Sequence, residues 1–196
     1  MRKTILISVL IVVFAVGTAF ALGIPGMGGG GGLKKETKKL TLGQANASLK
    51  KFEGNPLAPQ AIEYITIGDA EFDDISLRLA KLEIVSGFAT KVVADANTKL
   101  DAAKTKEELT VLQDNVNAAS GALQPLVQEC TALGAKMPQV LSNLKSKLTS
   151  NPMLAGDVAK VLDPGRVKTI GEHISKLITD LASLVTKIKD KIATLV

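Results

Sequence analysis

The chain has 196 residues, a formal net charge of +5 at pH 7, and 46% hydrophobic but only 3% aromatic residues. This length is sufficient for one well-buried domain, in which roughly 70% of the extended chain's surface is buried. Nucleic-acid binders combine clustered basic residues with stacking aromatic side chains, so the mild charge and the scarce aromatics argue against that class. The single cysteine, Cys130, rules out an internal disulfide.

The first 21 residues have the pattern of a secretory signal peptide. Arg2 and Lys3 precede an apolar run that ends in Ala-Phe-Ala at residues 19–21, and signal peptidase accepts small residues three before and one before the cut. We therefore expect a mature protein that begins at Leu22, is periplasmic or extracellular, and has a net charge lowered from +5 to +3. The alternative is an uncleaved N-terminal membrane anchor, because the apolar run has about the ~20 residues that span a bilayer.

Residues 22–55 are predicted to form a flexible basic arm with room for a short helix. The five consecutive glycines at positions 28–32 cannot hold a fixed backbone cheaply. They do not resemble a phosphate-binding loop, since no strand precedes them and no Gly-Lys-Ser/Thr sequence follows. The basic stretch after them can contact a protein partner or, peripherally, an anionic envelope surface. Its candidate contact residues are Lys34, Lys35, Lys38 and Lys39.

Residues 56–196 are predicted to form an all-α domain. Apolar side chains recur at alternating spacings of three and four residues over residues 75–103, 109–133 and 167–188, as in a coiled coil. The stripe in the last of these segments is broad, which is typical of a helix packed among several neighbours. We therefore expect three long helices over residues 57–103, 106–149 and 152–195, joined by short turns into an elongated antiparallel bundle.

Local signals mark where these helices begin. Thr105 and Glu108 form a capping box, so a helix is expected to start at residue 106. Asn151 and Asp163 are each followed by a proline, which favours a cap followed by a first helical turn. They predict a short helix over residues 152–162 before the long C-terminal helix. Asp69 is expected to cap another helix after a break at Gly68.

Two prolines interrupt the middle helix. Pro125 and Pro138 each follow a glycine by four residues. Proline clashes with the carbonyl four residues before it, and glycine at that position eases the strain. Because the apolar spacing continues through Pro125, a kink is expected there. At Pro138 a kink and a turn both fit the sequence, and a turn would divide the domain into four or five helices.

No catalytic or metal-binding constellation is recognisable, so no enzymatic activity, metal or cofactor is expected. A di-iron bundle site needs Glu-x-x-His on two helices, and His173 is the only histidine in the sequence. We expect His173 at the surface or at the boundary of the core. The acidic residues 69–74 lack the glycine and the glutamate of a calcium loop. Cys130 falls in the core spacing and is expected to be buried; an exposed Cys130 would instead link two chains.

Residues 115–135 are the best candidate for a contact surface. Glu129 is the only charged residue of this segment, so even the side away from the core is uncharged. A helix with so little charge is buried centrally or contacts another chain. The candidate contact residues are Asn115, Asn117, Gln124 and Gln128.

These features predict an exported, non-enzymatic structural or interaction protein of the cell envelope, a helical bundle that self-associates or binds a protein partner. The alternative is a lipid-associating or pore-forming protein whose amphipathic helices lay their apolar stripes on a bilayer. A third class is a carrier of a small apolar ligand between helices, although no residue in the sequence marks such a site.

Overall fold

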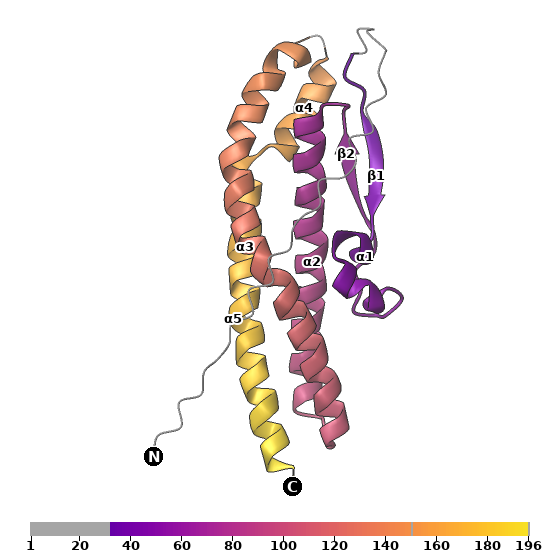
Figure 1. The fold of residues 1–196 in the computed structure, drawn as a ribbon, viewed down its shortest axis with the longest axis vertical. Coiled ribbons are helices and arrows are strands. Elements are labelled where there is room, and N and C mark those ends of the chain that lie inside the picture. Colours follow the sequence, from indigo (N-terminus) through magenta and orange to yellow (C-terminus); the bar gives the residue numbers. More distant parts are fainter. Residues whose placement is uncertain (1–31, 150, 196) are drawn as a thin grey trace, which may run out of the picture. The chain divides into compact units, whose positions relative to one another are not determined.

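The computed structural model describes residues 32–149 and 151–195, so the expected signal peptide and the glycine run up to residue 31 lie outside the described residues. The described residues are mostly helical, as predicted, with five α-helices and a small two-stranded sheet (Figure 1). In chain order the elements are β1 (Glu36–Leu40), α1 (Leu42–Ala45), the 3-10 helix η1 (Ala47–Phe52), β2 (Ile62–Thr66), α2 (Ala70–Leu100), α3 (Lys106–Leu148), α4 (Pro152–Val161) and α5 (Pro164–Thr194).

The three long helices α2, α3 and α5 pack against one another in pairs. After the turn at residues 101–105, α3 runs back along α2 in the opposite direction (Figure 1). The helix α5 runs parallel to α2, because Glu83 contacts Arg166 and, farther along both helices, Thr90 contacts His173. At the far end the ammonium group of Lys191 in α5 donates to two carbonyl oxygens at the end of α2, those of Leu100 at 2.5 Å and Asp101 at 2.8 Å.

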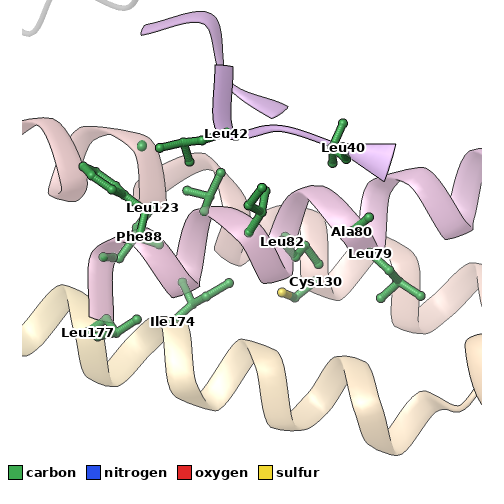
Figure 2. Packing of buried hydrophobic residues seen from close by; sticks show 14 of the residues in the cluster. Leu40, Leu42, Leu79, Ala80, Leu82, Phe88, Leu123, Cys130, Ile174 and Leu177 are labelled. Carbon is green, nitrogen blue, oxygen red and sulfur yellow. The ribbon is translucent and has the colours of Figure 1, made fainter. Parts of the chain in front are cut away.

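One hydrophobic core joins these helices. Phe88 of α2, Leu123 of α3 and Ile174 of α5 are fully buried, and side chains from all three helices and from the residues around α1 meet in this core (Figure 2). The buried positions of α3 follow the predicted spacing of three and four residues; they include Leu109, Leu112, Val116, Ala119, Leu123, Cys130 and Leu133. The apolar rhythm of the sequence therefore identifies the core side of this helix.

The helix starts predicted from capping residues are confirmed. The hydroxyl of Thr105 accepts from the backbone N–H of Glu108 at 3.2 Å, and the carboxylate of Glu108 accepts from the backbone N–H of Thr105 at 3.2 Å. Asn151 and Asp163 cap α4 and α5, each with a proline in the first turn. Asp69 caps α2. Each cap satisfies backbone donors that a first helical turn leaves without partners.

The helix α3 continues through both of its prolines as one element of 43 residues. The alternative of a turn at Pro138 is therefore wrong. Met137, Val140 and Leu144 around that proline are all buried, and their packing holds the backbone helical on both sides of it. The helix bends along its length instead of breaking (Figure 1).

The structure differs from the flexible arm expected over residues 22–55 in the part that it describes. Residues 36–52 form β1, α1 and η1, and a capping box of Thr41 and Gln44 starts α1. The physical reason is that apolar side chains alternate with the lysines in this segment. These apolar side chains are buried against the long helices; they are Leu40, Leu42, Leu49 and Phe52. The Phe52 ring packs against Phe88 of α2 with 4.8 Å between ring centroids.

Residues 57–69 also differ from the prediction, which placed a helix there. Residues 62–66 form β2, which pairs antiparallel with β1 so that Glu36 lies opposite Thr66 and Leu40 opposite Ile62. This segment is rich in β-branched side chains, which favour strands. Gly68 then adopts a φ of +80°, which side-chain-bearing residues rarely adopt, and turns the chain into α2.

We predict that Phe52→Ala destabilises the folded chain by about 3–5 kcal/mol, because it removes a buried aromatic side chain from a packed site. Denaturant unfolding followed by circular dichroism measures the change. Lys50→Ala is the matched control two residues before it, with an exposed side chain. If residues 36–52 were a loose arm, the two variants would unfold alike.

A second prediction concerns the cap of α2. Burial opposes ionisation of Asp69, but hydrogen bonds from Lys147 at 2.9 Å and from the N–H of Phe72 at 3.2 Å outweigh it, and the pKa of this carboxyl is lowered. A carboxyl whose pKa is lower in the folded state stabilises the fold above its unfolded pKa, and this stabilisation is lost as the pH falls through the folded pKa.

Asp69→Asn should therefore lower the Tm at neutral pH and have almost no effect at about pH 2, since asparagine still caps a helix but carries no charge. Thermal unfolding across this pH range is the measurement. An equal loss of Tm at both pH values would contradict the role of the charge.

Candidate interaction surface

The side of α3 that faces away from α2 and α5 is exposed over residues 117–142. Exposed residues follow one another there at spacings of four and three, which places them in one line along the helix. They are Asn117, Gly121, Gln124, Gln128, Thr131, Ala135, Pro138 and Ser142. We call these eight residues the outer stripe. None of them carries a charge.

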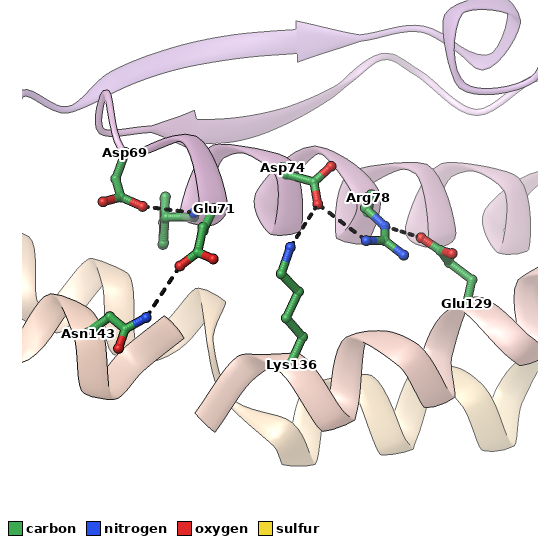
Figure 3. Close-up of polar contacts among 8 residues, drawn as sticks. Asp69, Glu71, Asp74, Arg78, Glu129, Lys136 and Asn143 are labelled. Carbon is green, nitrogen blue, oxygen red and sulfur yellow. Dashed lines mark hydrogen bonds and ion pairs between the residues drawn. The ribbon is translucent and has the colours of Figure 1, made fainter. Parts of the chain in front are cut away.

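The two charged residues within this range, Glu129 and Lys136, point toward α2 (Figure 3). The carboxylate of Glu129 is hydrogen-bonded to the guanidinium of Arg78 and raises its pKa. The ammonium of Lys136 lies 3.6 Å from the carboxylate of Asp74, which also accepts from Arg78 at 3.2 Å. The charges of this part of α3 are therefore neutralised at the contact with α2, and the outer stripe is left uncharged.

The corresponding side of α5 is uncharged over a shorter length. In the same phase relative to the buried residues of the helix, the exposed residues of α5 are Lys168, Glu172, Ser175, Thr179, Ala182, Thr186 and Lys189. Its four middle positions are uncharged, and charged residues lie at both of its ends. An exposed, uncharged line is therefore present on both helices, and the outer stripe of α3 is the longer of the two.

A groove of about 530 Å³ lies between α3 and α5 beside the outer stripe. Val127, Cys130 and Thr131 of α3 line this groove. Of these three residues, only Thr131 belongs to the outer stripe. Glycines on both helices keep this space open, and a Cβ added at Gly171 would lie 3.4 Å from the Cβ of Cys130. The outer stripe and the groove therefore meet at Thr131.

Cys130 is buried, as predicted, with 7% of its surface exposed. Burial raises the pKa of its thiol, and the neighbouring charge of Glu129 raises it further. A thiol with a raised pKa is a poor nucleophile at neutral pH because little of it is thiolate. The geometry therefore favours a core role for this side chain over a cross-link.

Three of the four amide residues singled out in the sequence lie together, since Asn117, Gln124 and Gln128 are all exposed on the outer stripe. Asn115 does not join them. It is half-buried and lines a different cavity, of about 320 Å³, with Val111 at the α2–α3 contact.

The four candidate lysines lie in and next to β1, which pairs with β2 on the other side of α2 from α3 (Figure 1). Lys35 contacts the carboxylate of Asp157 at 2.7 Å, and Lys39 lies 3.8 Å from that of Glu63. The structure therefore does not bring the lysines and the amide residues into one site.

Five members of the outer stripe were missed in the sequence: Gly121, Thr131, Ala135, Pro138 and Ser142. They are small or ordinary residues that draw no notice one at a time. The signal that identifies them is a second repeat of spacing four and three, opposite in phase to the buried repeat of the same helix.

Other chemistry is sparse in the part of the chain that the structure describes. His173 is exposed, as predicted, and its Nε2 lies 3.0 Å from the hydroxyl of Thr90. Among the described residues, no group of three or more His, Cys, Asp and Glu side chains is placed to hold a metal ion. Nor does any helix described between residues 32 and 195 have the length and apolar character needed to cross a membrane.

Known proteins give no family assignment for this arrangement. No protein-family model matches the chain, and neither curated proteins nor solved structures give a significant match. The function must therefore be inferred from the surface of the molecule itself.

We predict that the Cys130 thiol of the native protein reacts at least tenfold more slowly with a water-soluble disulfide reagent than the unfolded chain does, because the thiol is buried and its pKa is raised. The release of the coloured thiol product at neutral pH, with and without denaturant, measures both rates. Equal rates would show that Cys130 is accessible in the groove.

Proposed function

We propose that the protein is exported and acts as a non-enzymatic structural or interaction protein of the cell envelope, which binds another protein chain through the outer stripe of α3. The observation that carries this proposal is the line of eight exposed, uncharged positions, which extends over about 38 Å of helix at 1.5 Å per residue. The central parts of protein interfaces are depleted of charged residues in the same way.

The composition of the outer stripe supports a contact with protein. Covering a charged side chain without a partner is expensive, whereas amide and hydroxyl groups lose less on leaving water and can regain hydrogen bonds. Gln124 and Gln128 each offer donors and an acceptor, so they suit a partner surface with polar or backbone groups. Gly121 and Ala135 are small and allow a second backbone to approach closely.

Export is inferred from the N-terminal pattern of residues 1–21, and it places the described residues outside the cytoplasm. The lysines next to β1 provide a second, weaker contact in this proposal. Lys34 and Lys38 are exposed and can approach an anionic envelope surface, while Lys35 and Lys39 already have carboxylate partners. The main contact remains on α3.

The test introduces charge at the centre of the outer stripe. Gln124→Lys combined with Gln128→Lys should weaken association with the partner at least tenfold, because two positive charges would have to be buried. Sedimentation velocity of the purified chain from Leu22 onward, alone and with solubilised envelope proteins, measures the association.

The matched control is Ala94→Lys combined with Thr98→Lys. It adds the same charge at the same spacing of four residues to an exposed side of α2. Circular dichroism checks that both variants fold. If the α3 and α2 variants associate to the same extent as the unmodified chain, the outer stripe is not a contact surface.

A further inference from the structure

The outer stripe continues at its two ends into residues of opposite charge. Asp114 lies three residues before Asn117, and Lys145 lies three residues after Ser142, so both extend the same line along α3. Both side chains are exposed. The stripe therefore has an acidic end, a long uncharged middle and a basic end.

When two copies of the stripe lie side by side in opposite directions, the acidic end of each copy lies beside the basic end of the other. Resting on the function proposed above, we propose that the partner is a second copy of this chain, whose α3 lies antiparallel against the first with a twofold axis between Gln128 and Thr131. In this arrangement Asp114 of each copy faces Lys145 of the other, so both ends of the contact carry an ion pair. A parallel arrangement would place Asp114 against Asp114 and Lys145 against Lys145.

The uncharged middle fits the same arrangement. The spacings of four and three read identically from either end, so every member of the outer stripe faces another member across the axis. Gln124 faces Ala135 and Gly121 faces Pro138, which sets a larger side chain against a smaller one in each pair. Asn117 faces Ser142, and an amide with a hydroxyl offers a donor and an acceptor on each side.

The groove between α3 and α5 provides space next to the axis. Thr131, which lines the groove, faces Gln128 of the second copy, and that amide side chain can enter the volume of about 530 Å³. Such a contact is isologous, because the same patch is used on both copies and closes the assembly at two. One stripe per copy makes a small interface, so we expect a dimer with a Kd of about a micromolar.

The deciding experiment reverses one end of the stripe at a time. In Asp114→Lys both ends of the dimer would set lysine against lysine, and in Lys145→Asp both ends would set aspartate against aspartate. Each variant alone should raise the dimer Kd about tenfold, measured by sedimentation equilibrium of the chain from Leu22 onward. An equimolar mixture of the two should recover the Kd of the unmodified chain, because the mixed dimer has opposite charges at both ends.

Orientation is tested by disulfide trapping in a Cys130→Ala background. Asn117→Cys and Ser142→Cys should cross-link to each other when the two variants are mixed, and neither should cross-link to itself. Positions 117 and 142 lie about 38 Å apart along the helix, whereas a disulfide needs Cα atoms within about 7 Å. Self-cross-linking of Asn117→Cys would show a parallel contact and overturn the proposal.

Two outcomes separate this inference from the proposed function. If the unmodified chain is a monomer at every concentration tested while Gln124→Lys with Gln128→Lys still reduces binding to an envelope protein, the second copy is wrong and the contact surface stands. If the unmodified chain is a dimer that neither charge reversal weakens, the antiparallel register is wrong. Retained circular dichroism and Tm show that a loss of dimer is not a loss of fold.

Discussion

The burial of one side of α3 against both α2 and α5 is the constraint on which the rest of the structure depends. Because α3 packs on two helices at once, its rotation about its own axis is fixed by the buried line that runs through Leu109, Val116, Leu123 and Leu133. The opposite side of the helix is then exposed by geometry, and its composition becomes a property of the molecular surface.

Hydrogen bonds and ion pairs between α2 and α3 act together with this packing. Along the two antiparallel helices, the pair of Lys147 with Asp69 at 2.9 Å is followed by Asn143 with Glu71 at 3.4 Å and by Lys136 with Asp74 at 3.6 Å. Figure 3 shows the last two of these pairs. Such partly exposed pairs contribute little stability one by one. Their common effect is on register, since sliding α3 by one turn along α2 would separate every pair and leave Glu129 without Arg78.

The long helices and their starts were predictable because the signals are local. A capping box such as Thr105 with Glu108 needs four consecutive residues, and the apolar spacing needs only a few turns of one helix. The small sheet was not predictable on this basis, because β1 acquires its partner from β2 more than twenty residues later, and neither strand is strongly patterned alone. The burial of Leu42, Leu49 and Phe52 was missed for the same reason, since the lysines around them suggested a solvated segment.

The candidate surface was predictable in part. The sequence shows that residues 115–135 lack charge, but it does not show that Glu129 is neutralised by Arg78, which is 51 residues away in the chain. It also does not separate Asn115, which is half-buried, from Asn117, which is exposed two residues later. Both facts depend on which side of α3 meets α2, and that is a tertiary property.

The prolines of α3 have a consequence for any molecule that covers this helix. Pro125 has no N–H, so it cannot donate to the carbonyl oxygen of Gly121, and Gly121 has no side chain to shield that oxygen. A backbone acceptor on an exposed ridge must keep its water or exchange it for a donor. A larger side chain at position 121 would cover part of this oxygen, so the recognition chemistry of this part of α3 depends on the glycine together with the proline four residues later.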